Sequence, residues 1–229
     1  NTNLIFTTAL TRKFSAKFSN KTGFTYTKMY YDMDMNLAPH LMQPLELISE
    51  GKGNTDLISA YTSSSIGLSD QVTLNVGINV QVLTLNNSWV LEPRAGVKWQ
   101  ASPKSSFALA YGLHSRMEKM DVYFVKTQGT GDRSVNKDLD FTKAHHVMLS
   151  YGFKVSDNMN VKIEPYFQYL YDVPVIADSS YSVLNRRDFY VEDALVNRGK
   201  GRNIGIDLTL ERYLNKGLYY MVTASIFNS

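Results

Sequence analysis

The stretch that decides the fold is residues 71–101, which read QVTLNVGINVQVLTLNNSWVLEPRAGVKWQA. In the first half of this stretch, apolar side chains occupy every second position and mostly polar ones fill the positions between. This period of two is typical of a β-strand with one apolar face. Strands of soluble sheets have about 5 or 6 residues, whereas a strand that crosses an outer membrane needs roughly 9 to 11. The strand is therefore long enough to cross. Its apolar residues are Val72, Leu74, Val76, Ile78, Val80 and Val82.

The second half of the stretch repeats the alternation in the returning direction. Trp89, Leu91 and Val97 share one face, and charged or polar residues occupy the other. A Lys or Arg that faces lipid costs roughly 2 to 4 kcal/mol at the bilayer midplane. We therefore expect the polar face to line a lumen and the apolar face to meet lipid. The polar residues are Glu92, Arg94, Lys98 and Gln100.

Composition indicates a folded β protein. The chain has 229 residues, no cysteine, 15 Tyr, 11 Phe and a formal charge of +3. These values exclude a disordered chain and a disulfide scaffold, and so small a charge predicts no nucleic-acid partner. No run of about 18 apolar residues, the length of a transmembrane helix, occurs.

Taken in order, the sequence predicts about ten strands with connections that are alternately short and long. Short turns are expected at residues 15–17, 69–70, 102–104, 157–158 and 215–217. Long connections are expected at residues 36–55, 118–143 and 173–201. Transmembrane barrels have this asymmetry, with tight periplasmic turns and long extracellular loops. We predict an all-β fold, a transmembrane antiparallel β-barrel segment whose long loops lie outside the cell and help to select a ligand.

Three segments resemble the barrel of TonB-dependent outer-membrane receptors of the Bacteroidetes type. They are TLNVGINVQVLTLNNSWVLEPRAGVKWQ (73–100), SPKSSFALAYGLHSRME (102–118) and GKGRNIGIDLTLERYLNKGLYYMVTASIF (199–227). The resemblance implies a plug domain inside a barrel of about 22 strands. It also implies residence in the outer membrane of a Gram-negative bacterium, among outer-membrane lipid. The implied function is import of a scarce or bulky ligand, energised by the TonB complex.

The resemblance also sets the expected domain organisation. Residues 1–229 would form a partial β-barrel domain, with the plug domain and the closing strands absent from this chain. The implied partners are the receptor's own plug domain and the TonB complex. Neither the ligand nor the presence of a surface-exposed lipoprotein is specified by the resemblance.

Five residues are predicted to face the lumen and to contact ligand or plug. The alternatives are an interior ladder of charges that holds neighbouring strands, and polar groups solvated by channel water. Adjacent strand residues point to opposite faces, so His145 and His146 cannot chelate one metal ion together. The acidic stretches lack the calcium-loop pattern, and we predict neither a metal site nor a cofactor. The five residues are Glu92, Arg94, His114, Arg116 and Glu164.

An enzymatic function is not expected. The sequence has no nucleophile elbow and no zinc-ligand spacing. Ser115 lies beside His114, but the alternation places the two side chains on opposite faces. Two other classes remain open, a small complete barrel of ten strands acting as a passive pore or adhesin, and a soluble β-sheet binding protein.

Overall fold

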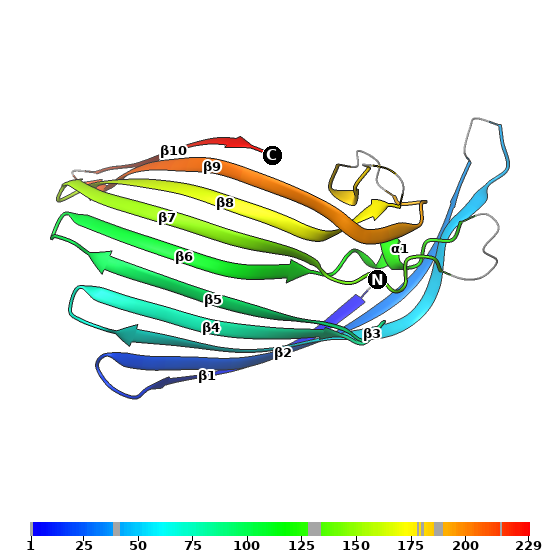
Figure 1. Cartoon of the computed structure of the whole chain (residues 1–229), viewed down its shortest axis with the longest axis horizontal. Coiled ribbons are helices and arrows are strands. Elements are labelled where there is room, and N and C mark those ends of the chain that lie inside the picture. Colours follow the sequence, from blue (N-terminus) through cyan, green and yellow to red (C-terminus); the bar gives the residue numbers. More distant parts are fainter. Residues whose placement is uncertain are drawn as a thin grey trace.

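The computed structural model describes residues 2–38, 42–127, 134–177, 179, 181–185, 190–215 and 217–229. Ten strands in these residues form one antiparallel sheet in chain order (Figure 1), which confirms the predicted all-β fold. The strands are β1 (Thr2–Lys13), β2 (Phe18–Leu37), β3 (Glu46–Gly67), β4 (Val72–Leu83), β5 (Ser88–Gln100), β6 (Ser105–Arg116), β7 (Thr142–Ser156), β8 (Met159–Ile176), β9 (Leu195–Asn215) and β10 (Leu218–Asn228). Two short helical segments accompany them, α1 (Met120–Tyr123) and η1 (Val183–Asn185).

Each strand pairs with its neighbours in the chain, and β1 and β10 form the two edges of an open sheet. The turns that follow β1, β3, β5, β7 and β9 gather at one end of the sheet, at the left of Figure 1. The longer connections lie at the opposite end, which we call the loop end. None of the helices in the described residues is long and apolar enough to span a membrane.

The strand alternation gives the sheet two chemically different faces. We call the face that carries Glu92 and Arg94 the inner face, and the opposite one the outer face. Register partners share a face, so Asn79 and Gly77 of β4 lie beside these two residues on the inner face. The outer face carries large apolar side chains that stay exposed in the described structure. Examples are Val76, Ile78, Leu91, Val97, Leu109, Leu149, Phe167 and Ile204.

The connection between β2 and β3 is shorter than the sequence suggests. A loop over residues 36–55 is expected, but β2 and β3 stay paired as far as Leu37 and Glu46. The connection is residues 38–45, of which 39–41 lie outside the described residues. Gly51 and Gly53 belong to β3, and a Cβ at Gly51 would lie 2.6 Å from the Phe124 ring.

The predicted loop over residues 173–201 is also shorter. Pairing of β8 with β9 extends to Ile176 and Leu195. The predicted turn at 215–217 joins β9 to β10, although residue 216 lies outside the described residues.

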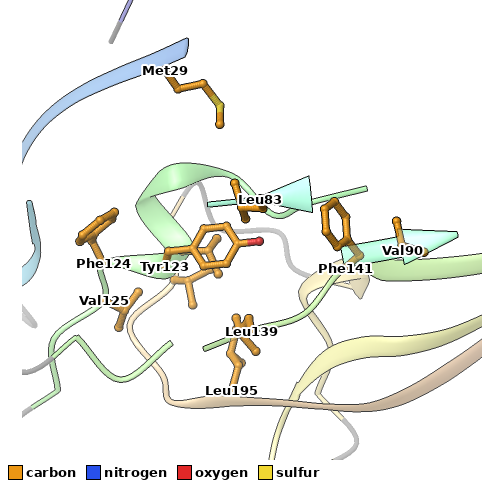
Figure 2. Close-up of a cluster of buried hydrophobic side chains, with 11 residues drawn as sticks. Met29, Leu83, Val90, Tyr123, Phe124, Val125, Leu139, Phe141 and Leu195 are labelled. Carbon is orange, nitrogen blue, oxygen red and sulfur yellow. The ribbon is translucent and has the colours of Figure 1, made fainter. Parts of the chain in front are cut away.

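The core of the structure lies at the loop end and not between two sheets. The stretch 118–143, which the sequence predicts as a long connection, supplies most of a buried hydrophobic cluster (Figure 2). Tyr123 and Val125 are fully buried in it, and Leu83 and Val90 contribute from the inner face. Residues 128–133, which belong to the predicted long connection 118–143, lie outside the described residues. The other members of the cluster are Met29, Val122, Phe124, Leu139, Phe141, Val191 and Leu195.

Candidate functional site

The carboxylate of Glu92 is the centre of a hydrogen-bond network on the inner face. Only 1% of this residue is exposed. Its oxygens accept hydrogen bonds from Asn79 Nδ2 at 2.9 Å, from Gln81 Nε2 at 3.0 Å and from Arg94 Nη2 at 2.8 Å. The backbone N and the Oγ of Ser115 each donate a further bond at 2.7 Å. A buried carboxylate is stable only when donors satisfy its oxygens in this way.

The course of β5 explains how Ser115 reaches Glu92. Pairing of β5 with β6 runs only from Arg94 to Gln100 on the β5 side. The preceding residue, Pro93, has no N–H to continue the ladder. Beyond this point the Glu92 side chain links the two strands, because it accepts the backbone N–H of Ser115 that the ladder leaves unpaired.

Arg94 stands at the edge of a hollow on the inner face. Its side chain is 49% exposed and is held by the ion pair with Glu92. A cavity of about 830 Å³ lies beside it, lined also by Tyr61, His114 and His146. Glycines form part of its floor, and a Cβ at Gly112 would lie 2.7 Å from His114 Nε2. The missing side chain therefore lets the His114 ring lie along the sheet.

The two histidines of this hollow come from neighbouring strands. The ring of His114 in β6 and that of His146 in β7 are 6.2 Å apart between centroids, in an edge-on arrangement. Together with the Arg94 guanidinium, they place hydrogen-bonding groups around an open space. This arrangement can bind a polar or anionic group. Among the described residues, no group of three or more His, Cys, Asp or Glu side chains is placed to hold a metal ion.

The five predicted residues fall into separate groups. Glu92, Arg94 and His114 lie together, whereas Arg116 sits at the end of β6 opposite Thr142. Glu164 in β8 forms an ion pair with Lys162 of the same strand, with 2.8 Å between Oε1 and Nζ, and lines a second cavity of about 560 Å³. Their contact with ligand or plug stays a prediction.

Sequence reasoning missed several members of the site. The alternation places Ser115 on the outer face, but both its backbone N and its hydroxyl reach the inner-face carboxylate. Asn79 and Gln81 are polar residues in an alternating strand, a signal too common to single them out. His146 pairs with Gly112 in the row that contains Arg94, and the sequence of β7 alone does not reveal this register.

A folded segment covers the inner face at the loop end. We call residues 117–127 and 134–141 the cover segment. Its Tyr123 hydroxyl accepts a hydrogen bond from the Glu118 backbone N at 3.2 Å, and Thr142 Oγ1 donates to Glu118 Oε1 at 2.7 Å. Burial raises the pKa of Tyr123 to about 12. Asn86 Nδ2 donates to the Leu139 carbonyl at 2.7 Å, which fixes the cover segment to the β4–β5 connection.

No protein-family model matches the sequence, and no curated protein matches it at a significant level. Solved structures do match. The siderophore receptor PirA from Pseudomonas aeruginosa superposes with a TM-score of 0.67 at 13% identity, over 98% of this chain and 40% of that one. The FrpB iron transporter from Neisseria meningitidis (F5-1 variant) gives 0.63 at 15% identity, over 98% and 36%. The copper transporter OprC gives 0.64 at 10% identity, over 98% and 38%.

These structural neighbours are TonB-dependent outer-membrane receptors and transporters. The chain spans 40% or less of the length of each of the three. At such low sequence identity the similarity shows the fold. The ten strands have the fold of part of a receptor barrel.

Proposed function

We propose that residues 1–229 are a partial β-barrel domain of a TonB-dependent receptor of the Bacteroidetes type. The receptor resides in the outer membrane of a Gram-negative bacterium and imports a scarce or bulky ligand with energy from the TonB complex. The observation that carries this proposal is the pair of opposed faces on a sheet with the barrel fold. One face is apolar and exposed, and the other carries the network around Glu92.

The apolar outer face fits outer-membrane lipid as its partner. Lipid tails cannot form hydrogen bonds, so a sheet inside a membrane must have its backbone groups paired and its outward side chains apolar. The described strands from β2 to β9 pair on both sides. The free edges of β1 and β10 then join the remaining strands of a larger barrel, since lipid does not tolerate an open edge.

The inner face fits a plug domain and a ligand, and neither requires catalysis. In this proposal the Glu92 carboxylate holds the Arg94 side chain in place. The residues that contact plug or ligand are Arg94, His114, Arg116 and Glu164. An Arg94→Ala variant of the intact receptor should lose ligand uptake while it still reaches the membrane. A Lys98→Ala variant on the same strand, outside the Glu92 network, is the matched control.

The test of the proposal is the size and behaviour of the intact polypeptide that carries these residues. It should be extracted from outer membranes and run on a denaturing gel with and without boiling. We expect a band several times heavier than 25.9 kDa that migrates differently when it is not boiled. A 25.9 kDa species that stays soluble without detergent would refute the proposal. Co-purification would show whether a surface lipoprotein accompanies the receptor.

A further inference from the structure

A groove beside the cover segment is unusually rich in methionine. It has a volume of about 660 Å³ and lies between β2 and the start of the cover segment. The chain contains nine methionines, all within the described residues, and five of them line this groove. They are Met29, Met33, Met35, Met117 and Met120.

The β-strand period explains one wall of the groove. Met29, Met33 and Met35 are odd-numbered residues of one strand, so their side chains share the inner face of β2. Met29 is buried in the hydrophobic cluster, whereas Met33 and Met35 are half-buried. The last two therefore remain partly accessible where they line the groove.

Backbone contacts of the cover segment place the other wall against this one. Met35 pairs with Ser49 of β3, and Ser49 Oγ donates to the carbonyl of Asp121 at 3.3 Å. The Glu50 backbone N donates to the Phe124 carbonyl at 3.3 Å. These bonds hold the segment that carries Met117 and Met120 alongside the β2 methionines, and both are half-buried like Met33 and Met35.

The charges around the groove favour a cation. Four acidic residues line it and only one basic residue does, so the potential there is negative. Alternation points the side chains of Asp32 and Asp34 to the face opposite Met33 and Met35, and Asp32 forms an ion pair with Lys52 at 2.6 Å. The acids on the methionine side are therefore Glu118 and Asp121. The lining acids are Asp32, Asp34, Glu118 and Asp121, and the base is Lys119.

We propose that the methionine groove binds a soft monovalent cation, Cu(I), through thioether sulfurs. Thioether ligands select Cu(I) over hard cations such as Mg²⁺ and Ca²⁺, which take oxygen ligands. Zn²⁺ is disfavoured, because the groove residues include no His or Cys among the described residues. Met33, Met117 and Met120 also pack against the hydrophobic cluster, but they stay half-buried and, with Met35, line the groove. The assignment of Cu(I) as a transported ligand rests on the proposed function, whereas binding itself does not.

The experiment measures Cu(I) binding to the intact polypeptide in detergent, by competition with the Cu(I) chelator bicinchoninate. The test variants are Met33→Leu with Met35→Leu, and Met117→Leu with Met120→Leu. Leucine has nearly the volume of methionine, so these pairs retain the fold. The matched control is Met159→Leu with Met221→Leu, two methionines that line neither this groove nor the cavity beside Arg94.

We expect the wild-type protein to take Cu(I) from the chelator and each groove pair to weaken binding at least tenfold. The control pair should bind as the wild type does, and X-ray absorption should show sulfur neighbours of the copper. A wild-type protein that takes up no Cu(I), or groove variants that bind like the control, would overturn the proposal. These binding measurements are independent of the gel experiment with and without boiling, which tests the receptor assignment. The copper site can therefore fail while the receptor assignment holds, and the reverse.

Discussion

At the residue scale, the buried carboxylate of Glu92 joins three strands. All five groups that contact it are donors, and they come from β4, β5 and β6. Hydrogen bonds to a charged group are stronger than neutral ones. Asn79 is fixed in addition, because its Oδ1 accepts a bond from Ser59 Oγ at 2.8 Å. The network therefore specifies the orientation of each amide as well as the position of Arg94.

A Glu92→Gln substitution should destabilise the protein by about 1.5–3 kcal/mol, the worth of a hydrogen bond to a charged group. In either orientation, the new NH₂ group would face a group that can only donate, the Arg94 guanidinium or the Ser115 backbone N–H. The measurement is the temperature at which the unboiled gel form disappears. An Asp157→Asn variant is the control, because the ion pair of this 95% exposed side chain with Lys154 contributes little. Equal shifts for the two variants would contradict the prediction.

The buried phenol of Tyr123 makes the cover segment sensitive to alkali. Its pKa of about 12 in the folded protein lies above the ordinary value of 10.0, so folding favours the neutral form. The stability gained from its burial is complete below pH 10 and is lost as the pH rises through about 12. Phenolate absorbance, compared between the wild type and Tyr123→Phe, should show one phenol that ionises near pH 12. Identical curves above pH 11 would refute this assignment.

At the element scale, the sequence predicts most strands and fails where side chains from distant segments alter local preferences. Alternation from Val72 to Trp99 predicts the central hairpin, because each strand there is apolar on one face only. Gly51 and Gly53 suggest a loop, yet they lie in β3, where the rings of Phe124 and Tyr31 fill the space that a side chain would need. No local pattern carries that information.

The candidate site shows the same limit. Alternation identifies Glu92 and Arg94 as residues of the polar face. It misplaces Ser115, whose backbone N and hydroxyl both donate to Glu92 beyond the last β5–β6 register pair, Arg94 with Gly112. The register that brings His146 next to Gly112 depends on how the strands pair across the cover segment, and the sequence of β7 alone does not fix it.

The close approach of Phe124 to Gly51 gives a prediction for the cover segment. A Gly51→Ala substitution places a Cβ 2.6 Å from the Phe124 ring, whose centroid lies 4.6 Å from that of the tilted Tyr31 ring. We expect a loss of about 1–3 kcal/mol from overpacking, seen as a lower unfolding temperature. In the double variant with Phe124→Ala, the new methyl group meets no ring. The stability loss of the double variant should therefore be smaller than the sum of the losses of the two single variants. Strict additivity would show that the two residues do not interact.

The two faces of β4 provide a matched pair of substitutions. Val76→Lys introduces a charge on the outer face, and Asn75→Lys introduces the same charge one residue away on the inner face. If the outer face meets lipid, the first should cost about 2–4 kcal/mol and the second much less. The amount of heat-modifiable protein in the outer-membrane fraction measures the difference. Similar losses for both variants would count against a lipid-facing outer surface.

At the scale of the whole molecule, the decisive feature is the pair of unpaired edges on β1 and β10. A sheet of ten strands that closed on itself would pair these edges and form a small barrel. A larger barrel would keep them apart and insert further strands between them. The two architectures have different functions, a passive pore in the first case and a receptor with room for a plug in the second.

Engineered disulfides distinguish the two architectures, since residues 1–229 contain no cysteine. Thr7→Cys with Thr25→Cys is the positive control, because these residues are register partners with hydroxyl oxygens 3.3 Å apart. Thr7→Cys combined with Thr223→Cys or Ser225→Cys probes contact between β1 and β10. On oxidation of the intact protein in membranes, we expect the control pair to cross-link and the edge pairs to stay reduced, because a disulfide requires Cα atoms within about 7 Å. A cross-link between the edges would instead establish a closed barrel of ten strands and remove the space that a plug domain needs.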